Sequence, residues 1–147
     1  MKLHGGCYCG AVRFSVDGDP LLQAQCHCRE CQYIMGGGPN FTILFAAEAF
    51  RYTGGKIQSF TRSDLDQPAT REFCVTCGTH LVTRPANGLR AAVKVGCLDD
   101  PSVFSPSAAV FTIDKQPFHP IPEGLRQYEQ APSAKVATLN SAKQRQA

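Results

Sequence analysis

The sequence predicts a mainly β fold in a single domain, and three observations support this prediction. Apolar residues recur at every second position in several short segments, which is the period of a half-buried strand. The 13 glycines and 10 prolines predict many turns, as in strand-rich folds with short connections. The 147 residues fit one domain with its own core and leave little room for two.

Nine strands are predicted along the chain, and alternation is clearest in residues 12–16, 41–45 and 91–95. In order, they are residues 12–16, 21–26, 41–45, 50–52, 57–61, 71–73, 79–83, 91–95 and 110–113. The Gly54-Gly55 pair predicts a hairpin between the fourth and fifth of these strands. Short helical turns are expected only around residues 29–33 and 99–104.

The formal net charge of +3 lies in the C-terminal tail. Lys135, Lys143 and Arg145 belong to the tail, and subtracting these three from the 15 basic residues leaves 12, which equals the 12 acidic residues. A neutral body lacks the basic face typical of nucleic-acid-binding proteins, so we expect no nucleic-acid partner. We assign the domain to residues 1–132 and expect residues 133–147 to be a disordered polar tail, because their few apolar side chains cannot offset the ordering entropy.

No targeting or membrane segment is visible in the sequence. Residues 1–7 contain no apolar run of the signal-peptide type, and no apolar stretch approaches the ~18 residues of a membrane span. We therefore expect a soluble, cytoplasmic protein with no membrane partner. In a reducing cytoplasm, cysteines persist as thiols or metal ligands rather than as disulfides. The eight cysteines therefore need an explanation.

Seven of the cysteines fall into groups whose spacing suits a metal. The groups are Cys7 with Cys9, then Cys26, Cys28 and Cys31, then Cys74 with Cys77. Zinc takes four ligands in a structural site, and three protein ligands plus an open position in a catalytic site. Seven cysteines divide naturally into four and three, so we expect two zinc ions per chain.

The first predicted site combines two close pairs. Cys74 and Cys77, followed by Gly78, have the spacing of a zinc knuckle, which supplies two ligands and needs two more. Cys7 and Cys9 lie two residues apart, so an extended strand would point both thiolates to one face. Together the four form a closed structural site. The alternative is a set of buried free thiols or a redox pair.

The second predicted site is the compact cluster of Cys26, Cys28 and Cys31. Three thiolates from six consecutive residues can cap one face of a zinc ion and leave the opposite face free for chemistry. The alternative is a second structural zinc that His27 or Cys97 closes as fourth ligand. Otherwise Cys97 is expected to be a small buried hydrophobic residue.

Other polar side chains near these groups carry weaker predictions. Arg13 and Arg29 are candidates to pair with the carboxylates of a substrate, although solvated surface arginines are the simpler interpretation. His4, His80 and His119 are isolated in the sequence, and we expect each to be hydrogen-bonded or exposed.

Four motifs occur in order along the chain. They are residues 5–14 (GGCYCGAVRF), 26–32 (CHCRECQ), 71–79 (REFCVTCGT) and 96–101 (GCLDDP). This series resembles the glutathione-dependent formaldehyde-activating family, which also includes centromere protein V, and the resemblance runs from about Leu3 to about Pro132. Relatives commonly carry an aromatic pair with tryptophan after the region of Lys115, whereas this chain has no tryptophan.

The resemblance implies a β-tent fold, in which antiparallel sheets lean together with zinc at their junction. It also implies the roles of the two cysteine groups. The implied structural ligands are Cys7, Cys9, Cys74 and Cys77, and the implied catalytic ligands are Cys26, Cys28 and Cys31. The activity named for the family joins glutathione and formaldehyde into S-hydroxymethylglutathione, and it is classed as a carbon–sulfur lyase.

These observations favour a zinc-dependent enzyme that activates a thiol such as glutathione. A thiol that binds zinc gives up its proton, and the resulting thiolate can attack a carbonyl carbon such as that of formaldehyde. A rival hypothesis is a non-catalytic module with two zinc ions that binds a protein or nucleic acid. A third is an enzyme that acts on a different thiol or small electrophile.

Overall fold

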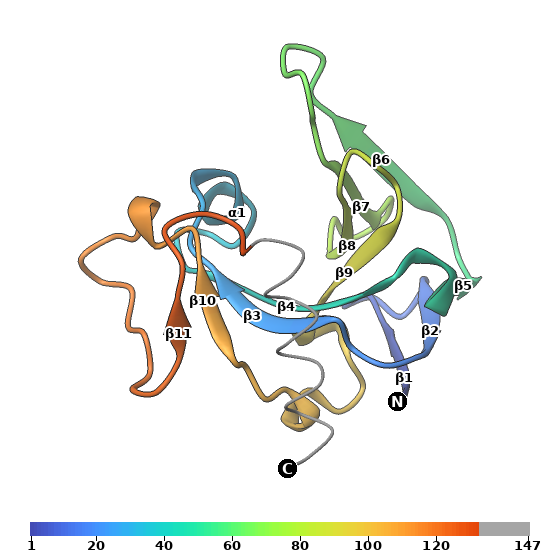
Figure 1. Cartoon of the computed structure of the whole chain (residues 1–147). Helices are drawn as coiled ribbons and strands as arrows, with labels where there is room; N and C mark the ends of the chain where they lie inside the picture. The colour runs from blue at the N-terminus through green and yellow to red at the C-terminus, as the bar shows by residue number, and fades with distance from the viewer. Residues whose placement is uncertain (133–147) are drawn as a thin grey trace. The chain divides into compact units, whose positions relative to one another are not determined.

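The computed structural model describes residues 1–132, and the predicted tail at residues 133–147 lies outside the described residues. The chain forms two compact units. The first contains Met1–Pro20 and Leu44–Val103, and the second contains Leu21–Ile43 and the described residues that follow Val103. Both units are built mainly of strands (Figure 1), so the predicted mainly β fold is confirmed.

A three-stranded antiparallel sheet begins the first unit. Its strands, in spatial order, are β1 (Lys2–Gly6), β2 (Arg13–Asp17) and β5 (Phe50–Gly54). The alternation of apolar residues predicted β2 correctly, since Phe14 and Val16 are only 1% and 2% exposed. The ring of Phe14 on the central strand β2 packs against that of Phe50 on the neighbouring strand β5 at a centroid distance of 5.1 Å.

Four further strands of the first unit pair in the order in which they follow one another along the chain. They are β6 (Ile57–Thr61), β7 (Thr70–Cys74), β8 (His80–Arg84) and β9 (Arg90–Lys94), and each pairing is antiparallel. Leu81, Val82 and Val93 are fully buried and form the core on which this part of the unit is built. Sequence neighbours that pair directly keep the loop closures short.

The predicted hairpin around Gly54-Gly55 is wrong. β5 pairs with β2 and β6 pairs with β7, so the two strands belong to different sheets. Gly55 has φ +86°, and a Cβ atom there would lie 2.2 Å from the carbonyl oxygen of Ala11. The glycine pair therefore lets the backbone pass close to the segment before β2, and it does not form a two-residue hairpin turn.

The second unit contains strands in mixed orientation. Its order is β11 (Arg126–Gln127), β10 (Ala108–Val110), β3 (Leu22–Cys26) and β4 (Asn40–Ala46), of which β4 continues past the boundary of the unit. β10 runs parallel to both β3 and β11. The expected antiparallel pairing is joined here by parallel pairing, because the long connection between β3 and β10 permits a parallel return.

The last predicted strand, residues 110–113, is largely wrong, because the observed strand β10 lies at Ala108–Val110 and shares only Val110 with it. β10 ends at Val110 because Phe111 adopts φ 54°, the left-handed conformation, and residues Thr112–Asp114 form a 3-10 turn. The short helix α1 (Arg29–Ile34) confirms the predicted helical turn, and a 3-10 turn at Pro101–Val103 lies in the second predicted helical region. Among the described residues, no helix has the length and apolar character needed to cross a membrane.

Candidate metal centres

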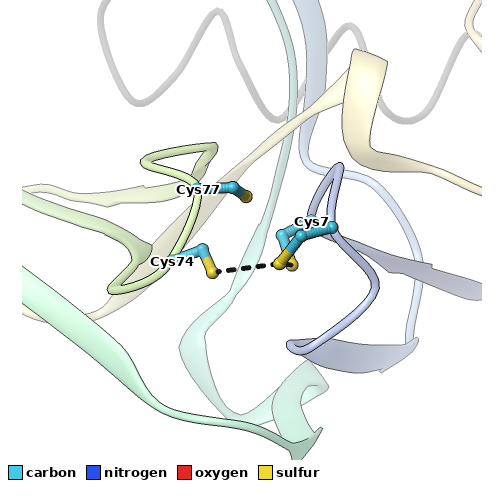
Figure 2. A group of neighbouring side chains, drawn as sticks. Cys7, Cys74 and Cys77 are labelled. Carbon is cyan, nitrogen blue, oxygen red and sulfur yellow. Dashed lines mark hydrogen bonds between the residues drawn. The ribbon is translucent and has the colours of Figure 1, made fainter.

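The first cysteine group brings two distant segments of the first unit together. Cys7 and Cys9 follow β1, Cys74 ends β7, and Cys77 lies in the turn before β8. The four sulfur atoms lie within 4.8 Å of one another, and Figure 2 shows Cys74 and Cys77 facing Cys7. The sulfur of Cys9 lies 3.5 Å from that of Cys7 and 3.8 Å from that of Cys74. Four sulfurs around one zinc ion at ~2.3 Å would be about 3.8 Å apart, so this group has the dimensions of a zinc site.

A tight turn, not an extended strand, holds Cys7 and Cys9. The amide of Gly10 donates to the carbonyl of Cys7 at 3.0 Å, and Gly10 has φ +81°. The amide of Val12 donates to the sulfur of Cys7 at 3.2 Å. The prediction of an extended strand over this pair is wrong, because a glycine in the left-handed conformation closes a turn that brings both sulfurs to the same side.

The Cys74–Cys77 segment forms the predicted knuckle. The amide of Gly78 donates to the carbonyl of Cys74 at 2.9 Å, and Gly78 has φ +72°, a conformation that favours glycine. The hydroxyl of Thr79 accepts from the amide of Tyr8 at 3.1 Å and lies 3.1 Å from the sulfur of Cys77. Thr79 therefore links the knuckle to the N-terminal turn.

The electrostatics of the first group favour a bound cation. The hydroxyl of Thr79 and then the backbone amides of Thr79 and Cys9 lower the pKa of Cys77 to about 5. A hydrogen bond from the backbone of Ala11 lowers the pKa of Cys9, but hydrogen bonding to Cys7, partial desolvation and hydrogen bonding to Cys77 and Cys74 together raise it to about 12. Neighbouring thiols therefore resist ionising together, because their thiolates would repel one another. A bound divalent cation offsets that repulsion.

The second cysteine group lies in one short segment of the second unit. Cys26 ends β3, Cys28 is the residue that caps α1, and Cys31 lies within α1. Their three sulfur atoms lie within 4.8 Å of one another. The amide of Cys31 donates to the sulfur of Cys28 at 3.4 Å, and this local bond folds the segment back on itself. Cys26 and Cys31 are buried, whereas Cys28 is partly exposed.

The three thiols of this group also disfavour joint ionisation. The pKa of Cys26 is raised far above its usual value by hydrogen bonding to Cys28, then to Cys31, and by burial. The pKa of Cys28 is raised as well, because hydrogen bonding to Cys31 and burial outweigh the lowering effect of its bond to Cys26. Sulfur donors are ligands that zinc prefers, so both cysteine groups fit this metal, and all eight cysteines are free of disulfides.

Comparison with known proteins identifies the family. A sequence model described as glutathione-dependent formaldehyde-activating enzyme matches residues 2–114. The chain belongs to this family. The matched residues contain both cysteine groups and all four motifs, so the resemblance inferred from the motifs is confirmed.

Two known proteins are similar to this chain, one in sequence and one in fold. A protein of Halomonas elongata, provisionally named a glutathione-dependent formaldehyde-activating enzyme, is 33% identical over 87 residues, which are 55% of this chain and 55% of that protein. The chain thus spans about half the length of this curated relative. A crystal structure of a Rhodobacter sphaeroides protein matches with a TM-score of 0.53 and 23% identity, over 66% of this chain and 88% of that one. This second likeness concerns the fold alone.

In this member of the formaldehyde-activating family, the side chain of His27 is fully occupied by neighbours other than the cysteines. Its Nε2 atom lies 3.0 Å from Nε2 of Gln25, and its Nδ1 atom lies 3.0 Å from Nδ1 of His119. His27 is absent from the three-sulfur group. Cys97 belongs to neither group, and its buried thiol donates to the carbonyl of His80 at 3.0 Å. These positions favour the interpretation of Cys97 as a small buried residue.

Both candidate arginines have partners within the chain. Arg13 donates from Nη1 to Asp99 at 2.8 Å, and the two form an ion pair. Arg29 donates to the side-chain oxygen of Gln32 and lies 5.0 Å above the ring of Tyr33. Arg13 is therefore part of an ion pair between the first and fourth motifs, and Arg29 remains next to the second cysteine group.

Sequence reasoning missed the environment of His119. This residue is 3% exposed and pairs with His27, which is fully buried. The expectation that His119 is hydrogen-bonded or exposed holds, but its partner His27 lies 92 residues away along the chain. No local pattern indicates a contact over that separation, and only the parallel return of β10 beside β3 brings the two segments into the same unit.

Proposed function

We propose that this protein is a zinc-dependent enzyme that joins a thiol, such as glutathione, to formaldehyde or a related small electrophile. The reverse of this reaction cleaves a carbon–sulfur bond, which places the enzyme among the carbon–sulfur lyases. The proposed structural zinc ligands are Cys7, Cys9, Cys74 and Cys77, and the proposed catalytic zinc ligands are Cys26, Cys28 and Cys31. The protein works in a reducing compartment, the cytoplasm, where its eight free cysteines stay available for metal.

The observation that supports this proposal is the unequal composition of the two groups. The first contains four sulfurs, which complete a tetrahedral shell, whereas the second contains three. The nearest histidine in sequence, His27, has both ring nitrogens engaged with other side chains. The second group therefore leaves a coordination position for a substrate, in a protein whose family is defined by a thiol-dependent reaction.

The chemistry of the three thiolates suits activation of a thiol. Zinc bound there would favour the ionised form of a substrate thiol and so raise its nucleophilicity. Cys26, Cys28 and Cys31 carry three negative charges against two on the metal, which weakens any pull on a carbonyl oxygen. In the net reaction a carbon–sulfur bond forms, the carbonyl π bond breaks, and the thiol proton ends on the carbonyl oxygen to give a hydroxymethyl group.

Arg29 is the proposed partner of a glutathione carboxylate. It follows Cys28 directly and lies at the start of α1, and its guanidinium is held by Gln32 and by the face of Tyr33. A planar guanidinium fixed in this way can bind a carboxylate through two hydrogen bonds. We expect Arg29→Lys to raise KM for glutathione more than it lowers kcat, since the group binds substrate away from the reacting atoms.

Metal analysis combined with glutathione titration tests the proposal. We expect two zinc ions per purified chain, and we expect glutathione to change the sulfur coordination of one of them, as seen by X-ray absorption. Cys28→Ser should bind one zinc and should not accelerate hydroxymethylglutathione formation above the spontaneous rate. Two zinc ions that ignore glutathione, with no acceleration by the native protein, would instead favour the non-catalytic binding module.

A further inference from the structure

Two buried histidines beside the second cysteine group have no part in the thiol chemistry described above. His27 is 0% exposed and His119 is 3% exposed. Their Nδ1 atoms lie 3.0 Å apart, and their rings are 5.1 Å apart between centroids. Two buried imidazoles at this distance require one nitrogen to donate and the other to accept. The direction of that bond follows from the groups at each end.

The partners of His119 determine its tautomer. Its Nε2 atom lies 2.6 Å from the carbonyl oxygen of Gly37, and a carbonyl only accepts, so Nε2 carries a proton. The backbone amide of Gln116 donates to Nδ1 of His119 at 3.3 Å, so Nδ1 carries none. The Nδ1 atom of His27 must then donate to Nδ1 of His119.

The other end of the chain of bonds agrees with this assignment. The side-chain nitrogen of Gln25 donates to the carbonyl of Pro120 at 3.1 Å, which determines which way the amide faces. The same nitrogen lies 3.0 Å from Nε2 of His27, so this Nε2 atom accepts. The bond directions therefore place a proton on Nδ1 of His27 and on Nε2 of His119, and every bond from Gln25 to Gly37 points in the same direction.

A second set of bonds reaches the same segments through Gln32. Its side-chain nitrogen donates to the carbonyl of His27 at 2.8 Å and to the carbonyl of Asp114 at 2.9 Å. Its own carbonyl accepts from the amide of Gly37 at 2.6 Å. The segment from Asp114 to Pro120 is thus tied to the cysteine turn and to the glycine turn after α1. Gln32 is 2% exposed, so water does not compete effectively for these bonds.

We propose that His119 is a positioning residue, which acts through His27 and Gly37 to hold the cysteine turn in the geometry that binds a metal. This inference rests on the proposed function in one respect, namely that Cys26, Cys28 and Cys31 bind the catalytic zinc. Groups that orient metal ligands without touching the metal typically change metal affinity ~10–100-fold when they are replaced. We expect His119→Ala to weaken zinc binding at the second group by about 10–100-fold, while the first group keeps its zinc.

Competition with a zinc chelator, using the full-length protein, measures this effect. His119→Gln places an amide nitrogen where Nε2 donates to Gly37, and it should recover part of the lost affinity. Gln23→Ala is the matched control, because Gln23 is equally buried and holds the amide of Ser105 in the same unit. This control should leave zinc affinity at the second group unchanged. Cobalt substitution supplies a second readout, since a loosened site changes the visible absorption of the three-sulfur shell.

Nitrogen NMR of the native protein tests the bond directions without any variant. We expect the proton of the His27–His119 bond on Nδ1 of His27, and the proton of the bond to Gly37 on Nε2 of His119. Any other pair of tautomers overturns the inference, as does a His119→Ala protein with native zinc affinity at the second group. If His119→Ala does not fold, the tautomers of the native protein and the zinc affinity of the His119→Gln protein test the inference instead. A native protein that holds no metal at the second group overturns both the inference and the proposed function. A native protein that binds zinc there, with an affinity that His119 substitutions do not change, overturns the inference alone.

Discussion

Replacing one cysteine in each group tests whether the two groups have different roles. Cys74→Ser removes a ligand from the group that joins the N-terminal turn to β7. Cys28→Ser removes a ligand from the group that lies within one short segment. Each variant loses one sulfur from one metal, so the chemical change is matched. The two differ in the length of chain that the metal closes into a loop.

The loop lengths give the size of the expected difference. Cys9 and Cys74 are 65 residues apart, whereas Cys26 and Cys31 are separated by 31 − 26 = 5 residues. Loop-closure entropy grows as (3/2)RT ln n, so a ratio of 65 to 5 corresponds to about 2 kcal/mol. We expect Cys74→Ser to lower the free energy of unfolding by about 2 kcal/mol more than Cys28→Ser. In a chain of this size that is a difference of roughly 4–8 °C in Tm.

Urea unfolding followed by circular dichroism measures this difference, and metal analysis of the same samples counts the zinc that each variant retains. Cys97→Ser is the control, because Cys97 is a buried thiol outside both groups, and it should retain two zinc ions. A Cys74→Ser protein that is already unfolded in buffer would also support the assignment, because its loss of stability relative to Cys28→Ser would be larger than expected and of the same sign. Equal losses of stability in Cys74→Ser and Cys28→Ser would refute the assignment of a structural and a catalytic site.

Three other predictions concern the stability of the first unit. Gly5→Ala would place a Cβ atom 2.2 Å from the carbonyl oxygen of Cys97, and we expect it to lower stability by about 3 kcal/mol, seen as a lower Tm. Glu72→Gln disrupts a nearly buried carboxylate that accepts from Tyr52 and Arg84, and urea unfolding should show a loss of about 1–3 kcal/mol. The hydrogen bond from Arg13 lowers the pKa of Asp99 below its ordinary value of 3.8. The ion pair therefore stabilises the fold above pH 3.8 and loses its effect as pH falls through the folded pKa, so the native and Asp99→Asn proteins should differ in Tm at pH 7 and converge near pH 2.

The sequence predicted most strands and the division of the cysteines because both follow from local spacing. Alternating apolar residues mark β2 and β9, and α1 lies where the helical turn was expected. The two-residue gap between Cys74 and Cys77, with Gly78 after them, predicted a turn whose geometry depends on those residues alone. The four-sulfur and three-sulfur groups that the structure brings together match this division.

The features that the sequence did not predict depend on contacts between distant segments. The Gly54-Gly55 pair suggested a hairpin, but β5 and β6 each find a better partner elsewhere. The parallel pairing of β10 with β3 has no signal in a run of three small residues. The His27–His119 pair follows from that pairing, so it could not have been inferred before the topology was known.

The separation between Cys9 and Cys74 also has a consequence during protein synthesis. A ribosome adds about 5–20 residues per second, so 65 residues correspond to roughly 3–13 s. For that interval the first two thiols have emerged while their partners have not been made. The six-residue cluster from Cys26 to Cys31 is complete well before the four-sulfur shell can close. On the nascent chain, the cluster proposed for catalysis therefore has the first opportunity to capture an ion, before the four-sulfur group can form.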